Sequence, residues 1–129
     1  MSEKVQNILV VDDDEDILTA GRLLLKRKFG RVQTTSDPEQ IPALMAENSF
    51  DVILLDMGMP VMNGWEVARR LRADPAGKSL LIIAVTAHAM ERDRLRCFEA
   101  GCDLFFSKPV NFRKLGETIL EHCQSRRSS

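Results

Sequence analysis

Short apolar runs alternate along the 129-residue chain with longer stretches in which apolar residues recur every three or four positions. The short runs are rich in Val, Ile and Leu and have the length of β-strands, whereas the longer stretches have the spacing of amphipathic helices. This alternation predicts five strand–helix units. The predicted strands are NILVV, RVQTT, DVILLD, LLIIAV and DLFF, at residues 7–11, 31–35, 51–56, 80–85 and 103–106.

Capping signals and apolar stripes mark the helices that follow these strands. Acidic residues favour a helix N-terminus because of the helix dipole, and Pro suits the first helical position. The signals are Asp14 to Asp16, Asp37 with Pro38, Asn63 with Gly64, residues 87–89, and Val110 with Asn111. The helical period is followed in the first helix by Ile17, Leu18, Gly21, Leu24, Leu25 and Lys28, and in the last by Phe112, Leu115, Ile119, Leu120 and Cys123.

Three of the predicted strands, NILVV, DVILLD and LLIIAV, are nearly continuous apolar runs. Such runs are typical of strands that are buried on both faces, so the sequence predicts a parallel sheet with helices on each side. The second strand, RVQTT, is more polar and fits an edge position. In open sheets of this kind, ligands bind beyond the carboxyl ends of the strands.

Composition bounds the class of protein. The length suits one domain, which we place at residues 1–124, with a disordered tail at 125–129. A net charge of −1 gives no field that would attract nucleic acid or an anionic membrane. No apolar run is long enough to span a bilayer and the N-terminus is too polar for a secretory signal, so we expect a cytoplasmic protein. Cys97, Cys102 and Cys123 lack disulfide or zinc spacing and are expected to be thiols.

Charged and polar residues stand where the predicted strands end. Asp12 and Asp13 follow the first strand, Asp56 the third, Thr86 the fourth and Lys108 the fifth. Two carboxylates about 4 Å apart repel by roughly 4 kcal/mol at an effective dielectric near 20, so three together need a cation or raised pKa values. Magnesium prefers such oxygen ligands and is often held by carboxylates together with phosphate oxygens.

These residue types suit phosphoryl transfer. Asp56 could attack phosphorus as a nucleophile, while a metal ion and Lys108 neutralise the charge on the transferring oxygens. Thr86 would donate a hydrogen bond to the same group. The sequence therefore predicts a phosphoryl site with Mg²⁺ at this edge of the sheet.

The segments VVDDDED, LLDMGMPVMNGWE, AVTAHAM and GCDLFFSKP occur in an order and spacing that resemble the receiver domain of bacterial two-component response regulators. The resemblance covers residues 6 to about 124. It implies an α/β, flavodoxin-like, doubly wound fold: a five-stranded parallel sheet in the order 2-1-3-4-5 with five helices. It also implies that Asp56 is the phosphoacceptor, with Asp13, Asp12, Asp56 and the backbone carbonyl of Gly58 at the magnesium ion.

The resemblance further implies a switch and its partners. Thr86 and Lys108 would contact the phosphoryl oxygens, Phe105 would be the switch aromatic, and a cis peptide bond would precede Pro109. The donor would be a histidine kinase or a histidine phosphotransfer protein, and the surface of helix 4, strand 5 and helix 5 would change. The domain would catalyse its own aspartyl phosphorylation and dephosphorylation without an external substrate, as a monomer or a weak phosphorylation-dependent dimer.

Other residues have plainer interpretations. Gly58 and His88 flank the expected acyl phosphate, where Gly58 would leave access for water, and His88 is expected to be exposed to solvent. Trp65 is expected to pack on the third helix. Met57, Met59 and Met62 are expected to pack rather than bind metal, because thioethers are poor magnesium ligands. Arg92, Arg94 and Arg96 are expected to form a solvated basic face.

An alternative class of enzyme remains open at this point. Asp12-Asp13-Asp14 after an apolar strand also fits the start of haloacid-dehalogenase-like small-molecule phosphatases, with Asp12 as nucleophile. Against this alternative, Asp16 stands where Thr or Val is expected, and the chain has no room for a cap domain. A pure interaction module is disfavoured by the complete set of Asp13, Asp56, Thr86 and Lys108.

Overall fold

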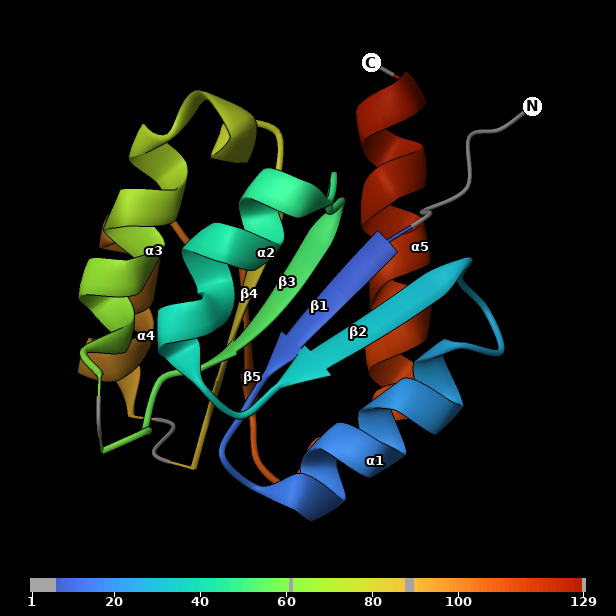
Figure 1. Ribbon diagram of the computed structural model, residues 1–129, viewed down its shortest axis with the longest axis horizontal. Helices are drawn as coiled ribbons and strands as arrows, with labels where there is room; N and C mark the ends of the chain where they lie inside the picture. The colour runs from blue at the N-terminus through green and yellow to red at the C-terminus, as the bar shows by residue number, and fades with distance from the viewer. Residues whose placement is uncertain (1–6, 61, 88–89, 129) are drawn as a thin grey trace.

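In the computed structural model, five parallel strands form one sheet in the order β2-β1-β3-β4-β5 (Figure 1). The structure describes residues 7–60, 62–87 and 90–128, with side chains described as far as residue 123. The observed order confirms the predicted 2-1-3-4-5 topology, and the polar strand β2 lies at an edge as expected. The strands are β1 (Asn7–Val11), β2 (Arg31–Thr35), β3 (Val52–Asp56), β4 (Leu81–Thr86) and β5 (Leu104–Ser107).

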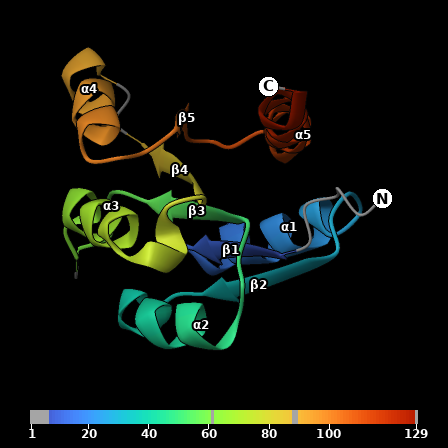
Figure 2. The ribbon, with the colours of Figure 1, turned by 90° about the horizontal axis from the view of Figure 1, so that it is seen from above.

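Helices cover both faces of the sheet, as the apolar strands require (Figure 2). Helices α1 and α5 lie on one face, and α2, α3 and α4 lie on the other. Two short 3₁₀ turns precede α2 and follow α3. The helices are α1 (Glu15–Leu25), α2 (Ile41–Glu47), α3 (Gly64–Ala73), α4 (Glu91–Glu99) and α5 (Phe112–Ser128), and the turns are η1 (Pro38–Gln40) and η2 (Pro75–Gly77).

Strand β1 shows why the sheet has two cores. Successive side chains of a strand point to opposite faces. Ile8 and Val10 accordingly pack with α1 and α5, whereas Leu9 and Val11 pack with the helices of the other face. All four side chains are at least 98% buried, which explains why residues 8–11 are all apolar.

Side-chain caps begin several of the helices where the sequence predicts them. Asp14 Oδ1 accepts a hydrogen bond from the backbone N–H of Asp16 at the start of α1. Asn63 Oδ1 accepts from the N–H groups of Trp65 and Glu66, which fixes the start of α3. These bonds satisfy N–H groups that have no partner within the helix.

Some details of the helices differ from the predicted pattern. Asp37 with Pro38 begins the 3₁₀ turn η1, and α2 starts only at Ile41. Leu24 belongs to the predicted apolar stripe of α1 but is 40% exposed, because α5 packs over Leu18 and Leu25 instead. The backbone of α5 continues to Ser128, beyond the predicted domain end at 124. The disorder expected for residues 125–129 stays a prediction.

The strand register brings the predicted polar residues to one edge. Val11 pairs with Leu55, and Asp56 pairs with Val85, so the residues that follow β1 lie beside the end of β3. Thr86 pairs with Ser107, the residue before Lys108. The carboxyl ends of β1, β3, β4 and β5 therefore form one rim. Among the described helices, none has the length and apolar character needed to cross a membrane.

Candidate functional site

Asp12 and Asp56 are buried carboxylates at the centre of this rim. Asp12 is 2% exposed and Asp56 is 4% exposed. Asp12 Oδ1 accepts a hydrogen bond of 2.9 Å from the N–H of Asp14, and Asp56 Oδ1 accepts one of 3.0 Å from the N–H of Gly58. Each carboxylate is thus oriented by the backbone of the loop that follows it, which leaves its second oxygen directed to other partners.

Lys108 contacts the second carboxylate oxygen of both Asp12 and Asp56. Its Nζ lies 3.1 Å from Asp12 Oδ2 and 3.3 Å from Asp56 Oδ2. The backbone N–H of Lys108 donates to the carbonyl of Thr86 at 2.8 Å, and the peptide bond between Lys108 and Pro109 is cis, as predicted. The lysine is therefore held at its backbone while its ammonium lies between two buried anions.

Burial and hydrogen-bonded or charged neighbours both act on the pKa values of Asp12 and Lys108. Burial, together with the charge of Asp56, raises the pKa of Asp12 to about 6, although the hydrogen bond from Asp14 and the contact with Lys108 act against the rise. Burial alone would lower the pKa of Lys108, but the hydrogen bond to Asp12 and the charges of Asp56 and Asp12 raise it. Lys108 therefore stays protonated at neutral pH.

Asp13 completes a group of three carboxylates that could hold a metal ion. Oxygen atoms of Asp12, Asp13 and Asp56 lie within 4.8 Å of one another, and Asp13 is exposed while the other two are buried. Three carboxylates in this arrangement provide the hard oxygen ligands that Mg²⁺ requires. An open side at Asp13 leaves room for the water molecules that Mg²⁺ usually keeps. The donor set therefore fits a magnesium ion.

Thr86 and Gly58 border a cavity beside the carboxylates. The cavity has a volume of about 380 Å³, and Met57, Trp65 and Cys97 also line it. Thr86 is 6% exposed and ends the buried strand β4. The predicted site residues from four strand ends are thus brought to one place, with a hollow next to them that a further group can enter.

Phe105 lies on β5, where it is half-buried and packs against the core under α2, α3 and α4. It pairs in register with Ala84, two residues before Thr86. A side chain that is half-buried can change its exposure without opening a cavity in the core. This position is compatible with the switch role implied by the resemblance, and that role stays a prediction.

The remaining candidates lie as follows. Met57 and Met59 are buried and Met62 packs against the same core, so packing is confirmed for all three. Trp65 is half-buried, and the Arg96 guanidinium stacks over its ring at 3.8 Å from the centroid. Arg92, Arg94 and Arg96 are all exposed, as expected for a solvated basic face, and Arg94 also lies over the Phe98 ring. His88 lies outside the described residues.

A groove beside the site was not predicted from the sequence. It has a volume of about 580 Å³ and runs between α1 and the loop that joins β5 to α5, with Lys108 in its wall. Ile17, Ala20 and Leu24 line it on the α1 side, and Pro109 and Val110 line it on the other side. The spacing of Ile17 and Leu24 along one helix face is the signal in the sequence, but the same spacing also fits a core-facing stripe.

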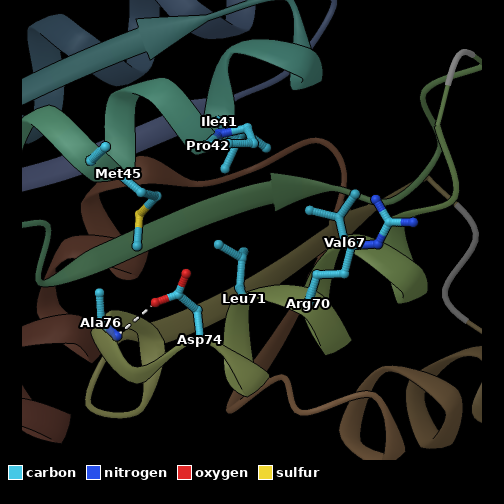
Figure 3. Close-up of a pocket in the computed structure, with 9 residues that line it drawn as sticks. Ile41, Pro42, Met45, Val67, Arg70, Leu71, Asp74 and Ala76 are labelled. Atoms are coloured by element: carbon cyan, nitrogen blue, oxygen red, sulfur yellow. Dashed lines mark hydrogen bonds between the residues drawn. The ribbon is translucent and has the colours of Figure 1, made fainter.

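A second cavity lies between α2 and α3, on the face of the sheet opposite the groove. It has a volume of about 300 Å³ and is lined largely by apolar side chains. Met45 from α2 and Leu71 from α3 point into it (Figure 3). Its lining includes none of the predicted site residues, so it is separate from the carboxylate cluster.

Comparison with known proteins agrees with the observed fold. Residues 8–120 match the model of the response regulator receiver domain. Among characterised relatives, the sensor histidine kinase RcsC of Escherichia coli K12 is 32% identical over 126 aligned residues, which cover 95% of this chain and 13% of RcsC. The chain therefore corresponds to a small part of that kinase. None of these matches supports the haloacid-dehalogenase-like alternative.

Solved structures show the same architecture. A CheY-like receiver domain protein from Methanospirillum hungatei superposes with a TM-score of 0.85 at 28% identity, covering 96% of this chain and 98% of that one. The receiver domain of sensor histidine kinase PA1611 from Pseudomonas aeruginosa gives a TM-score of 0.81 at 30% identity, covering 93% and 98%. That domain carries a magnesium ion in its active site cleft.

Proposed function

The chain belongs to the response regulator receiver domain family and is a phosphoryl-accepting signalling switch, and we propose that Asp56 is its phosphoacceptor. The observation that carries this proposal is the contact of Lys108 with a buried Asp56 whose other oxygen is oriented by the Gly58 N–H. A nucleophile held in place by the backbone, with a cation beside it, suits attack on a charged phosphoryl group.

The transfer step follows from these positions. A carboxylate oxygen of Asp56 forms a bond to phosphorus as the N–P bond of a phosphohistidine breaks, and the departing imidazole takes up a proton from water. The Lys108 ammonium, already 3.3 Å from Asp56, contacts the oxygens of the transferred group. Thr86, which borders the adjoining cavity, donates a hydrogen bond to the same oxygens. Hydrolysis of the acyl phosphate later returns the chain to its starting state.

Asp12, Asp13, Asp56 and the Gly58 carbonyl would hold the magnesium ion. Bound there, Mg²⁺ would neutralise negative charge on the transferring phosphoryl oxygens. The protein's own contribution is to hold Asp12 through the Asp14 N–H and to keep Asp13 open to solvent. Lys108 balances the charge of the two buried carboxylates before the metal binds.

The partner is a histidine kinase or a histidine phosphotransfer protein. The groove between α1 and the β5–α5 loop supports this assignment, because it is partly apolar and has Lys108 in its wall. A donor that places an apolar surface against Ile17, Ala20 and Leu24 brings its phosphohistidine to the edge that carries Asp56. Phosphorylation then changes the surface of α4, β5 and α5, with Thr86 and Phe105 as the residues that move. Cytoplasmic location and a monomer or weak dimer stay predictions.

The test is phosphorylation by a small donor followed by intact mass. Incubation with acetyl phosphate and magnesium is expected to add one phosphoryl group, lost again at the rate of hydrolysis, and beryllofluoride with magnesium is expected to block the labelling. Omission of magnesium is the matched control. A chain that stays unlabelled, or is labelled equally with and without magnesium, would contradict the proposal.

A further inference from the structure

Helix α4 ends in a tight turn that leads directly into β5. Gly101 adopts a positive φ of 108°, and its N–H donates to the carbonyl of Phe98 at 3.0 Å. The N–H of Cys102 donates to the carbonyl of Cys97, also at 3.0 Å. This pair of bonds is the Schellman pattern, which satisfies the last carbonyls of a helix. It leaves the carbonyl of Gly101 itself available to other donors.

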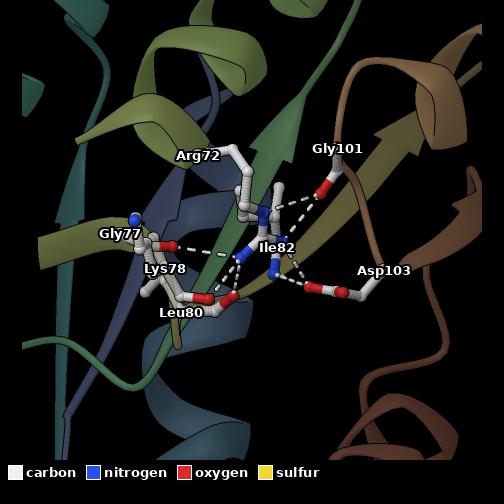
Figure 4. Close-up of polar contacts among 7 residues, drawn as sticks. All are labelled: Arg72, Gly77, Lys78, Leu80, Ile82, Gly101 and Asp103. Carbon is white, nitrogen blue, oxygen red and sulfur yellow. Dashed lines mark hydrogen bonds and ion pairs between the residues drawn. The ribbon is translucent and has the colours of Figure 1, made fainter. Parts of the chain in front are cut away.

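Arg72, in the last turn of α3, donates to that carbonyl. Its Nε and Nη2 lie 3.1 and 2.7 Å from the oxygen of Gly101 (Figure 4). Its Nη1 donates to three carbonyls of the segment that joins α3 to β4. These carbonyls belong to Gly77, Lys78 and Leu80, at 3.0, 3.2 and 2.8 Å.

Asp103 joins the same guanidinium to the sheet. Its Oδ2 accepts from Arg72 Nη2 at 2.6 Å and from the N–H of Ile82 at 2.9 Å. The N–H of Asp103 donates to the carbonyl of Ile82 at 2.8 Å. The ion pair is partly buried, with side chains 26% and 33% exposed. Arg72 thus fastens the end of α4 and the start of β5 to α3 and to the first residues of β4.

Two glycines allow this close approach. A Cβ at Gly101 would lie 3.2 Å from Cβ of Arg72, and a Cβ at Gly77 would lie 1.9 Å from the carbonyl oxygen of Leu71. A side chain at Gly101 would be strained by the positive φ and would crowd the Arg72 side chain, and one at Gly77 would overlap a backbone oxygen. Glycine at position 101 therefore lets the end of α4 lie close enough for the Arg72 side chain to bind its carbonyl.

The N-terminal half of α4 is held much more weakly. Its cap residue Met90 makes no side-chain cap bond and is 57% exposed. Of the nine residues of α4, all of which the structure describes, Cys97 alone is buried. Leu95 is 51% exposed, and Arg96 stacks over the Trp65 ring of α3. The weakly held end is the one that follows Thr86 along the chain.

We propose that Arg72 is a positioning residue of the switch: it fixes the C-terminal end of α4, so that a displacement at Thr86 swings the N-terminal half of the helix about Gly101. The inference rests on the proposed function and adds the fixed point about which the output surface moves. Multiple charge-assisted hydrogen bonds resist displacement, whereas an exposed and uncapped helix end moves at low cost in free energy.

The test is a comparison of amide spectra with and without beryllofluoride and magnesium, each protein against its own unbound spectrum. In the native chain, shift changes within α4 are expected to be large at residues 90–96 and to fall close to zero at 101–103. In Arg72→Lys, which keeps the charge but loses the fork of donors, changes at 99–103 are expected to grow to the size of those at 90–94. A residue that only stabilised the fold would leave this distribution unaltered.

Two further variants make the result decisive. Arg70→Lys, on the same helix and ion-paired with Glu66 one turn away, is the matched control and is expected to behave like the native chain. Asp103→Asn keeps an acceptor for the Ile82 N–H and is expected to reproduce the spread of changes even if Arg72→Lys does not fold. Native changes as large at 101–103 as at 90–94, or an unaltered pattern in both variants, would overturn the inference. A native chain with no change around Asp56 would overturn the proposed function as well.

Discussion

Lys108 Nζ lies 3.3 Å from Asp56 Oδ2, and the same ammonium lies 3.1 Å from Asp12. The cation proposed to hold the phosphoryl group is therefore in place before any phosphorus arrives, and it is shared between two buried carboxylates. Phosphorylation at Asp56, as proposed, would add negative charge there, so Lys108 would gain a stronger partner at the expense of Asp12. The starting contact thus prepares the site for the product without a large rearrangement of the lysine.

Replacement of the nucleophile is the most direct prediction. Asp56→Asn is expected to abolish labelling by acetyl phosphate, because an amide of nearly the same shape is not a competent nucleophile. The Gly58 N–H can still donate to the amide oxygen, so the fold is expected to persist. Intact mass measures the labelling and circular dichroism the fold. Full labelling of the variant at another residue would remove Asp56 from its proposed role.

Removal of the exposed carboxylate of Asp13 is expected to weaken metal binding without lowering stability in the absence of metal. Asp13→Ala is expected to weaken magnesium binding at least roughly 10- to 100-fold, the loss that even outer-shell partners of metal ligands cause. Without metal, the variant is expected to be as stable as the native chain or up to about 1 kcal/mol more stable, because repulsion from Asp12 and Asp56 is relieved. Isothermal titration and thermal melts in EDTA measure the two effects. Strong destabilisation in EDTA would contradict this interpretation.

The raised pKa of Asp12 gives a prediction on pH. The folded state binds the Asp12 proton more tightly than the unfolded state, with a pKa of about 6 against 3.8. The stability contributed by protonated Asp12 is therefore complete below pH 3.8 and is lost as the pH rises through about 6. Asp12→Asn cannot ionise, so in metal-free buffer it is expected to gain up to about 3 kcal/mol over the native chain at pH 8.

The gain of Asp12→Asn is expected to shrink toward zero as the pH is lowered to 4, since native Asp12 is then protonated. Lys108, with a pKa raised above its ordinary value, keeps its charge throughout this range. Urea unfolding in EDTA at several pH values measures the difference. A gain that does not vary between pH 4 and pH 8 would show that the effect does not arise from the titration of Asp12.

The sequence was sufficient to predict the sheet and the rim. Parallel strands buried on both faces must be continuously apolar, so runs such as residues 8–11 and 52–55 can be recognised without a structure. The polar residues that end these runs, Asp12 and Asp56, then stand out because the chain changes character abruptly there. The capping roles of Asp14 and Asn63 could also be predicted, since they depend on residues only two or three positions away.

The features that the sequence did not predict depend on contacts between distant residues. Arg72 binds Gly101 and Asp103, 29 and 31 positions away, and its own helix offers no sign of these partners. Leu24 has the spacing of a core residue, but the packing of α5 decides that it stays 40% exposed beside the groove. Periodicity identifies a helix face, and only the neighbouring elements decide how much of that face is covered.

The groove beside α1 predicts that a protein donor and a small-molecule donor of the phosphoryl group respond differently to a change in its lining. Ala20→Glu places a charged side chain in the groove, which is expected to slow transfer from an autophosphorylated histidine kinase roughly tenfold or more. Labelling by acetyl phosphate should stay within about twofold, since a small donor needs no docking surface. The same change at exposed Ala43 on α2 is the control. Equal slowing with both donors would indicate damage to the site rather than to the groove.

The last prediction concerns Thr86, which ends β4 beside the cavity next to Asp56. A switch that moves from about 1:99 to 99:1 requires roughly 5.5 kcal/mol of differential binding, here shared among Lys108, Thr86 and the metal. A hydrogen bond to a charged group contributes about 2 kcal/mol of this total. Thr86→Ala should therefore still accept phosphate on Asp56, but the active population should fall to roughly four fifths.

Amide shift changes on α4 and β5 upon addition of beryllofluoride measure this population. In Thr86→Ala they are expected to be reduced in proportion along the same residues, because the equilibrium changes while its two end states do not. Thr19→Ala, an exposed threonine on α1, is the control and should give the native changes. Full-sized changes in Thr86→Ala would refute the role given to this hydroxyl, whereas loss of phosphorylation itself would make Thr86 part of the chemistry rather than of the switch.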